Sequence, residues 1–180
     1  MAKTRPIAIG VASISLATYG DGVPGSDFKA LPLPFKGSVA FNFADPKEVK
    51  IETEGTDEPL YVTLVKDSTD YIEFAIPTPD NETVKTLRGG AISNGGGNKD
   101  IWEEPTSFES INKTVKMETM PHKGAKVIYT IVNGKIMAKF SEAPGAEKSE
   151  LLLVRVYKQA AITAAGVVKT AFTREVASVG

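Results

Sequence analysis

The stretch IEFAIPTPDNETVKTLRGGAI, residues 72–92, places a strand pattern directly before a helix pattern. Apolar and polar residues alternate over residues 72–76, which predicts a half-buried β-strand. Pro77 and Pro79 then end the strand, because proline cannot donate a hydrogen bond to a β-ladder. The segment that follows must therefore leave the sheet.

The segment after the prolines predicts a helix of barely two turns. Asp80 and Asn81 are good N-cap residues, and Gly89 suits the left-handed position that ends a helix. Val84 and Leu87 lie three residues apart and so share one face. A helix this short is not stable alone, so we expect Val84 and Leu87 to dock it onto a sheet.

The remainder of the chain is dominated by the alternation of apolar and polar residues that is typical of β-strands. About ten strands separated by regular turn signals indicate a sandwich or barrel. The predicted fold is therefore all-β with one short α-helix, in a β-sandwich or barrel-like arrangement. Apart from a first strand within residues 7–16, the predicted strands cover residues 35–43, 48–52, 60–65, 72–76, 114–119, 126–140, 150–162 and 167–176.

Two of these segments carry further expectations. In KVIYTIVNGKIMAKF, residues 126–140, the pair Asn133-Gly134 predicts a hairpin closed by a type I′ turn. In ELLLVRVYKQAAI, residues 150–162, the first half is apolar on both faces, as in a central strand. Together with VVKTAFT, residues 167–173, this second segment suggests a sheet that continues across a subunit boundary.

Composition and motifs point away from catalysis. The chain has 180 residues, a net charge of −1 and no cysteine, which excludes disulfides, thiolate catalysis and cysteine zinc sites. His122 is the single histidine, the glycine-rich residues 89–99 lack the order of a phosphate-binding loop, and the acidic run 52–58 lacks that of a calcium loop. We therefore predict no enzyme and no catalytic, cofactor-binding or metal-binding residue.

The order of these segments resembles the tail tube, or major tail, proteins of long-tailed bacteriophages. The resemblance rests on the glycine-rich lead-in DGVPGSDFKAL, residues 21–31, and on FKGSVAFNFADPKEVKIETEGTDEP, residues 35–59. It continues through the strand, proline step, short helix and glycine pair of residues 71–92. The C-terminal half departs more from the family and matches it mainly in its β-pattern.

This resemblance implies that residues 1–180 form a single β domain with extended loops and an N-terminal arm. Six copies would form a ring, and rings would stack into a tube through which genomic DNA passes without sequence-specific contact. The expected partners are the chain itself and other phage tail proteins, with no membrane. The expected location is the virion tail, assembled in the host cytoplasm. Residues 21–34 and 43–59 would bridge to the next ring and become ordered only on stacking.

A secreted β-sandwich module that binds carbohydrate is the alternative. Lys3 and Arg5 precede an apolar run, as in a signal peptide, although the alternation in this run favours a first strand. Tyr61, Tyr71 and Trp102 are candidates for stacking on sugars, although Trp102 also fits a residue that anchors a loop to the core. Aromatic residues make up only 8% of the chain and are scattered, which favours the self-assembling tail tube protein over the carbohydrate-binding module.

Overall fold

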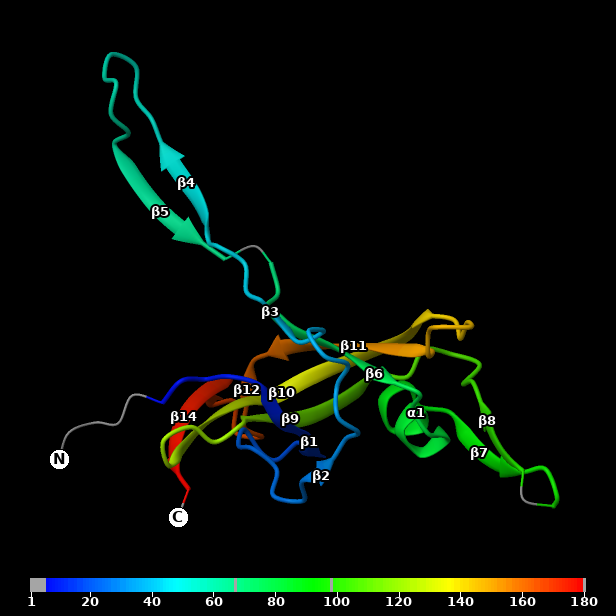
Figure 1. Ribbon diagram of the computed structural model, residues 1–180. Coiled ribbons are helices and arrows are strands. Elements are labelled where there is room, and N and C mark those ends of the chain that lie inside the picture. The colour runs from blue at the N-terminus through cyan, green and yellow to red at the C-terminus, as the bar shows by residue number, and fades with distance from the viewer. Residues whose placement is uncertain (1–5, 67, 98, 180) are drawn as a thin grey trace.

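The computed structural model describes residues 6–66, 68–97 and 99–179 and consists mainly of antiparallel β-strands (Figure 1). Within these residues there is a single short helix, which confirms the predicted fold class. Lys3 and Arg5, and the N-terminal arm expected there, lie outside the described residues. The strands are β1 (Val11–Thr18), β2 (Lys29–Ala30), β3 (Ala40–Asn42), β4 (Lys47–Ile51), β5 (Tyr61–Val65), β6 (Tyr71–Pro77), β7 (Ala91–Asn94), β8 (Asp100–Glu103), β9 (Ile111–Thr119), β10 (Ala125–Glu142), β11 (Leu151–Gln159), β12 (Ala161–Ile162), β13 (Val168–Lys169) and β14 (Phe172–Ser178), and the helix is α1 (Asn81–Arg88).

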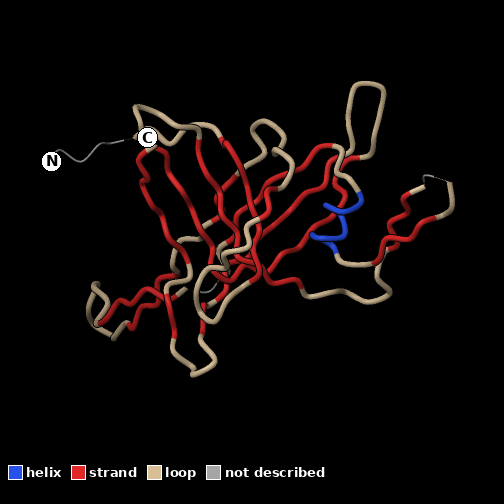
Figure 2. The backbone as a smooth tube through the Cα atoms, turned by 90° about the horizontal axis from the view of Figure 1, so that it is seen from below, coloured by secondary structure: helices blue, strands red, loops and turns tan. Residues whose placement is uncertain are grey.

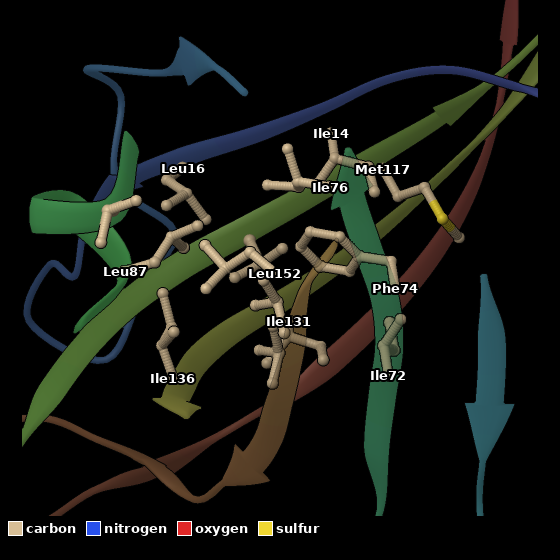
Figure 3. Packing of buried hydrophobic residues seen from close by; sticks show 14 residues of the cluster. Ile14, Leu16, Ile72, Phe74, Ile76, Leu87, Met117, Ile131, Ile136 and Leu152 are labelled. Atoms are coloured by element: carbon tan, nitrogen blue, oxygen red, sulfur yellow. The ribbon is translucent and has the colours of Figure 1, made fainter. Parts of the chain in front are cut away.

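The main sheet has the strand order β2-β1-β9-β10-β11-β6-β3, and β14 pairs with the N-terminal half of β10. β1 and β6 are far apart in this order. Even so, Ile14 and Leu16 of β1 and Phe74 and Ile76 of β6 belong to one buried cluster (Figure 3). The sheet must therefore curl so that its two ends face each other across a shared core, as in a sandwich or barrel.

Helix α1 forms as the sequence predicts. The Asp80 side chain accepts a hydrogen bond from the Thr83 backbone N–H at 2.7 Å, and Gly89 ends the helix with a φ of 79°. Val84 and Leu87 are fully buried in the core cluster. The helix packs against β10, so it closes one end of the curled sheet.

The hairpin predicted at Asn133-Gly134 is wrong. β10 runs without a turn through this pair, which lies opposite Gln159 and Lys158 of β11. Before the pair β10 is bonded to β14, after it to β11, and the register with β9 shifts between Ile131 and Gly134. Glycine is needed there because the neighbouring strands of the same chain approach closely. A positive φ is not the reason.

Gly134→Val should destabilise the fold by about 1–3 kcal/mol, because the core has no room for the added atoms. A Cβ at this position would lie 2.5 Å from the Val156 Cγ1 atom and 3.2 Å from the Lys113 carbonyl oxygen. Chemical denaturation checks the loss. Gly145→Val is the control, because no atom lies within 4 Å of the position of its Cβ. An equal effect of both changes would contradict the close approach.

The strand predicted over residues 35–43 is reduced to the three residues of β3. The chain turns at Gly37, which has a φ of 80°, and the Ser38 N–H bonds back to the Phe35 carbonyl at 3.1 Å. Phe35, Phe41 and Phe43 consequently remain substantially exposed rather than forming a buried face. Similarly, β1 begins at Val11, and Ile7 and Ile9 before it are exposed.

Two segments, residues 150–162 and 167–173, were expected to continue a sheet across a subunit boundary, and the structure treats them differently. β11 is central, as predicted, but it lies between β10 and β6 of the same chain, so it is not a strand at a subunit boundary. The C-terminal segment is split into β13 and β14, and β14 is bonded along one side only, to β10. Within the described chain, the outer side of β14 is thus an open edge.

Candidate subunit interface

A hairpin of β4 and β5 projects from the body of the molecule (Figure 1). We call residues 44–66, which include its strands and tip, the arm. The alternation in the sequence predicted these strands, but not that they would leave the sheet. All residues of β4 and all but Thr63 of β5 are exposed. Figure 2 shows most of the remaining strands in the body, whereas β7 and β8 form a second, separate hairpin next to helix α1.

The two faces of the arm differ in character. On one face Val49 lies opposite Thr63, and Ile51 lies opposite Tyr61. Val65 shares this face and lies opposite Lys47. Apart from Lys47 and Thr63 the face is apolar, and we call its four apolar residues, Val49, Ile51, Tyr61 and Val65, the apolar face. Val49, Ile51, Tyr61 and Val65 are 41%, 53%, 57% and 46% exposed.

The opposite face combines charge with apolar side chains. Glu48 and Lys50 of β4 form an ion pair with an N–O distance of 3.1 Å, and they lie opposite Leu64 and Val62 of β5. The strand β5 therefore exposes apolar side chains on both of its faces. An isolated two-stranded hairpin is at best marginally stable in water, and exposed apolar patches of this kind mark interaction sites.

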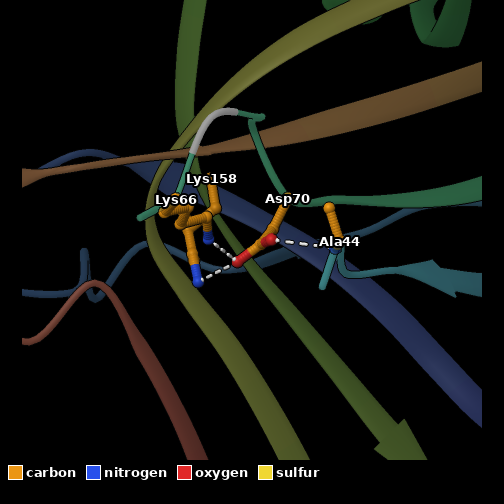
Figure 4. A network of polar contacts seen from close by, with 4 residues as sticks. All are labelled: Ala44, Lys66, Asp70 and Lys158. Carbon is orange, nitrogen blue, oxygen red and sulfur yellow. Dashed lines mark hydrogen bonds and ion pairs between the residues drawn. The ribbon is translucent and has the colours of Figure 1, made fainter. Parts of the chain in front are cut away.

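The root of the arm is tied to the body by Asp70, which precedes β6 (Figure 4). The Asp70 carboxylate forms ion pairs with Lys66 at one end of the arm and with Lys158 of β11. It also accepts a hydrogen bond from the Ala44 N–H, at the other end of the arm, at 3.3 Å. One buried carboxylate thus fixes both chain connections of the arm. We call this network the Asp70 latch.

Charge holds the Asp70 latch in its ionised form. Burial alone would raise the pKa of the Asp70 carboxyl, but the hydrogen bonds and charges of Lys158 and Lys66 outweigh burial. Together they lower this pKa from 3.8 to about 2. Ionised Asp70 therefore stabilises the fold at neutral pH, and this contribution is lost as the pH falls through the range between these two values.

Asp70→Asn should lower the free energy of unfolding at pH 7 by about 1–3 kcal/mol, because amide oxygens cannot replace a carboxylate between two ammonium groups. The difference from the unchanged chain should shrink as the pH approaches 2. Urea denaturation at a series of pH values measures both effects. Asp45→Asn, at an exposed position beside Ala44, is the control. A pH-independent difference would contradict the role of the charge.

Aromatic rings form a second support at the root. The Phe43 ring lies 5.6 Å from that of Phe41 and 5.3 Å from that of Phe172 on β14, measured between centroids. The Lys158 ammonium, which also binds Asp70, lies 5.2 Å from the centroid of Phe43. The latch and the aromatic cluster therefore share Lys158, and both direct the arm from the same place.

An apolar groove of about 480 Å³ lies on the body, between residues 8–11, residues 33–41 and the strands β9 and β10. We call it the body groove. Its lining is mainly aliphatic and aromatic, and within the described residues Lys36 is its single charged side chain. Four large apolar residues of the lining are exposed, namely Leu33, Phe35, Phe41 and Met120. The groove is therefore accessible from solvent.

The loop expected to become ordered only on stacking is bonded within the single chain. The Asp27 carboxylate accepts hydrogen bonds from the Thr18 N–H at 2.8 Å and from the Thr18 hydroxyl at 2.9 Å. The Gly25 N–H donates to the Thr114 hydroxyl at 3.0 Å. This expectation was therefore wrong for residues 21–27, which β1 and β9 hold in place.

The three candidate sugar-stacking residues do not come together. Tyr61 lies on the arm, whereas Tyr71 on β6 packs against Tyr157 with 5.1 Å between ring centroids. Trp102 is half-buried on β8, and its indole N–H donates to the Gly89 carbonyl at 2.9 Å. Trp102 thus anchors β8 to the end of helix α1, as the anchor reading predicts.

The acidic residues and His122 do not combine into a metal site in the described part of the chain. Among residues 6–66, 68–97 and 99–179, no three His, Asp or Glu side chains are grouped to hold a metal ion. The buried Nδ1 atom of His122 has no hydrogen-bond partner among the described residues. No helix in the described part of the chain is long and apolar enough to span a membrane.

The body groove and the latch were missed at the sequence level. Asp70 and Lys158 are far apart in the sequence, and no local pattern marks an ion pair between distant strands. The exposed arm did carry a signal, because β5 is apolar at consecutive positions while its partner strand is charged. No known family model matches the chain, and a search of curated proteins finds no match either.

Proposed function

We propose that this chain is a structural protein that assembles with copies of itself. The observation that carries the proposal is the arm, a projecting hairpin whose apolar face is exposed along both strands. Fully burying an apolar side chain stabilises a structure by about 1.5–3 kcal/mol. Covering the four side chains of the apolar face therefore supplies a substantial driving force for association.

The root of the arm supports the same function. Association costs less when the contacting surface is ordered beforehand, because less conformational entropy is lost on binding. The Asp70 latch and the aromatic cluster of Phe41, Phe43 and Phe172 fix the two ends of the arm to the body. The arm is thus a surface held ready for a partner, not a loose loop.

The form of the assembly follows from the resemblance of residues 21–92 to phage tail tube proteins. On this basis we propose six copies in a ring, rings stacked into a tail tube, and genomic DNA passing through the lumen during ejection. An arm that binds a different surface on the next copy gives a heterologous interface, which closes into a ring or continues as a filament. The partners are then the chain itself and other tail proteins, in the virion.

Sedimentation velocity and negative-stain microscopy of the unmodified chain test this proposal. With increasing concentration, we expect species larger than a monomer, and rings or tubes on the grid. A chain that remains monomeric at the highest soluble concentration, both alone and with other tail proteins, would overturn it. A carbohydrate-binding module would instead remain monomeric and bind to sugars on a glycan array.

A further inference from the structure

Two apolar surfaces of the described chain lack a partner, namely the apolar face of the arm and the body groove. We propose that the body groove is the receptor for the arm, and that the arm it receives belongs to a second copy of the chain. This inference rests on the self-association proposed above and adds where on the body the contact is made.

The apolar character of both surfaces is the first argument. The groove presents Leu33, Phe35 and Met120 to solvent, and these side chains are 59%, 50% and 48% exposed. Exposed Ile7 and Ile9 lie next to the segment that lines it. A hollow lined mainly by apolar side chains, several of them exposed, is typical of a binding site. The arm offers β-branched and aromatic side chains of a size that suits such a hollow.

Charge selects the arm from other apolar partners. The tip of the arm is acidic, because Glu52, Glu54, Asp57 and Glu58 follow one another between β4 and β5. Among the described residues that line the groove, the single charged one is a cation, Lys36. Opposite charges at the rim of an interface guide encounter and fix orientation, so an arm lying in the groove has favourable electrostatics.

The position of the arm indicates that its receptor is on another copy. The Asp70 latch ties the arm at Ala44 and Lys66, and from this root the arm extends away from the body (Figure 1). An arm that is fixed in this way cannot fold back over residues 33–41 of its own chain without breaking the latch. Each copy therefore offers one arm and one groove, and the contact is repeated from copy to copy.

Pairs of single-cysteine chains test the contact, since the unmodified chain has no cysteine. Ile51→Cys places a thiol on the apolar face of the arm, and Met120→Cys places one at the groove. Ile101→Cys, at an exposed position on strand β8, is the matched control. Two chains are mixed, allowed to assemble and then oxidised, and disulfide-linked heterodimers are measured on non-reducing gels. A disulfide requires Cβ atoms within about 4.5 Å.

We expect the arm and groove chains to link in several times the yield of the arm and control chains. The result is read only from samples in which microscopy or sedimentation shows assembly, so it is separate from the test of self-association. Assembly with equal yields from both pairs would overturn the groove contact and leave the proposed function standing. Absence of any assembly by the unmodified chain would overturn both.

A second variant tests the same contact without depending on disulfide geometry, because two thiols can lie close together and still be unable to form a bond. Leu33→Glu puts a negative charge into the apolar groove at an exposed position, where the monomer fold should tolerate it. Association should weaken by at least about tenfold, because an unpaired charge would be buried in the contact and the acidic tip would be repelled. Ile101→Glu, at an exposed position on β8, should associate normally. Unchanged association of Leu33→Glu would contradict the proposal.

Discussion

Replacing two residues of the apolar face, Ile51→Glu together with Tyr61→Lys, should abolish self-association while leaving the monomer folded. The two positions are directly opposite in the hairpin, so the new charges attract each other and keep the register of the arm. The contact with a partner, in contrast, loses apolar burial and must desolvate two charges. The combined cost of about 3 kcal/mol or more weakens association by at least about a hundredfold.

Sedimentation velocity measures the loss of association, and thermal unfolding of the dilute monomer measures the stability of the fold. The control is Ser93→Lys with Ile101→Glu, a directly opposite pair in the hairpin of β7 and β8, on another part of the surface. It should associate as the unchanged chain does. Normal assembly of the arm variant would mean that the apolar face is not an interface. Loss of assembly in both variants would point to a general effect of charge.

The largest loss of stability is expected from Leu87→Ala, at about 2–5 kcal/mol. Leu87 is 1% exposed and lies in the core cluster beneath helix α1, so truncation leaves a cavity at the closed end of the sheet. For a chain of this length, the loss corresponds to a fall in melting temperature of roughly 4–20 °C.

Differential scanning calorimetry measures this effect, and Lys85→Ala serves as the control within the same helix. Lys85 is exposed, and alanine is the best helix former, so this change should have almost no effect. A loss below about half a kcal/mol for Leu87→Ala would place it within the range of ordinary surface substitutions. It would show that the helix decorates the sheet without supporting it.

The sequence predicted the elements that local chemistry determines. Caps at Asp80 and Gly89 and the spacing of Val84 and Leu87 specify the helix, because each signal acts within a few residues. Alternation likewise predicted β6 and residues 114–119 of β9, and apolar residues on both faces predicted β11 as a central strand. What the sequence could not reveal is where each strand goes. Alternation predicted β4 and β5 as strands, and the consecutive apolar residues of β5 would equally suit a strand buried on both faces, yet the two strands form a free hairpin.

The error at Asn133-Gly134 has a similar origin. This dipeptide favours a tight turn in isolation, and the flanking alternation is the same for two short strands as for one long strand. The difference lies in contacts with Lys113 and Val156, on strands that come from either side in the sequence. Long-range packing outweighed the local preference, and the same holds for the ion pairs of Asp70.

The Asp70 latch has a consequence for when a newly made subunit can join others. Its cation Lys158 is on β11, which leaves the ribosome long after the arm and Asp70 have been synthesised. Until β11 docks beside β6, the root of the arm lacks the contact that ties it to the core. A partly made or misfolded chain therefore carries an arm without a fixed direction. For the assembly proposed above, the latch would act as a checkpoint, because the ability to recruit a neighbour would be gained only once the core of the subunit is complete.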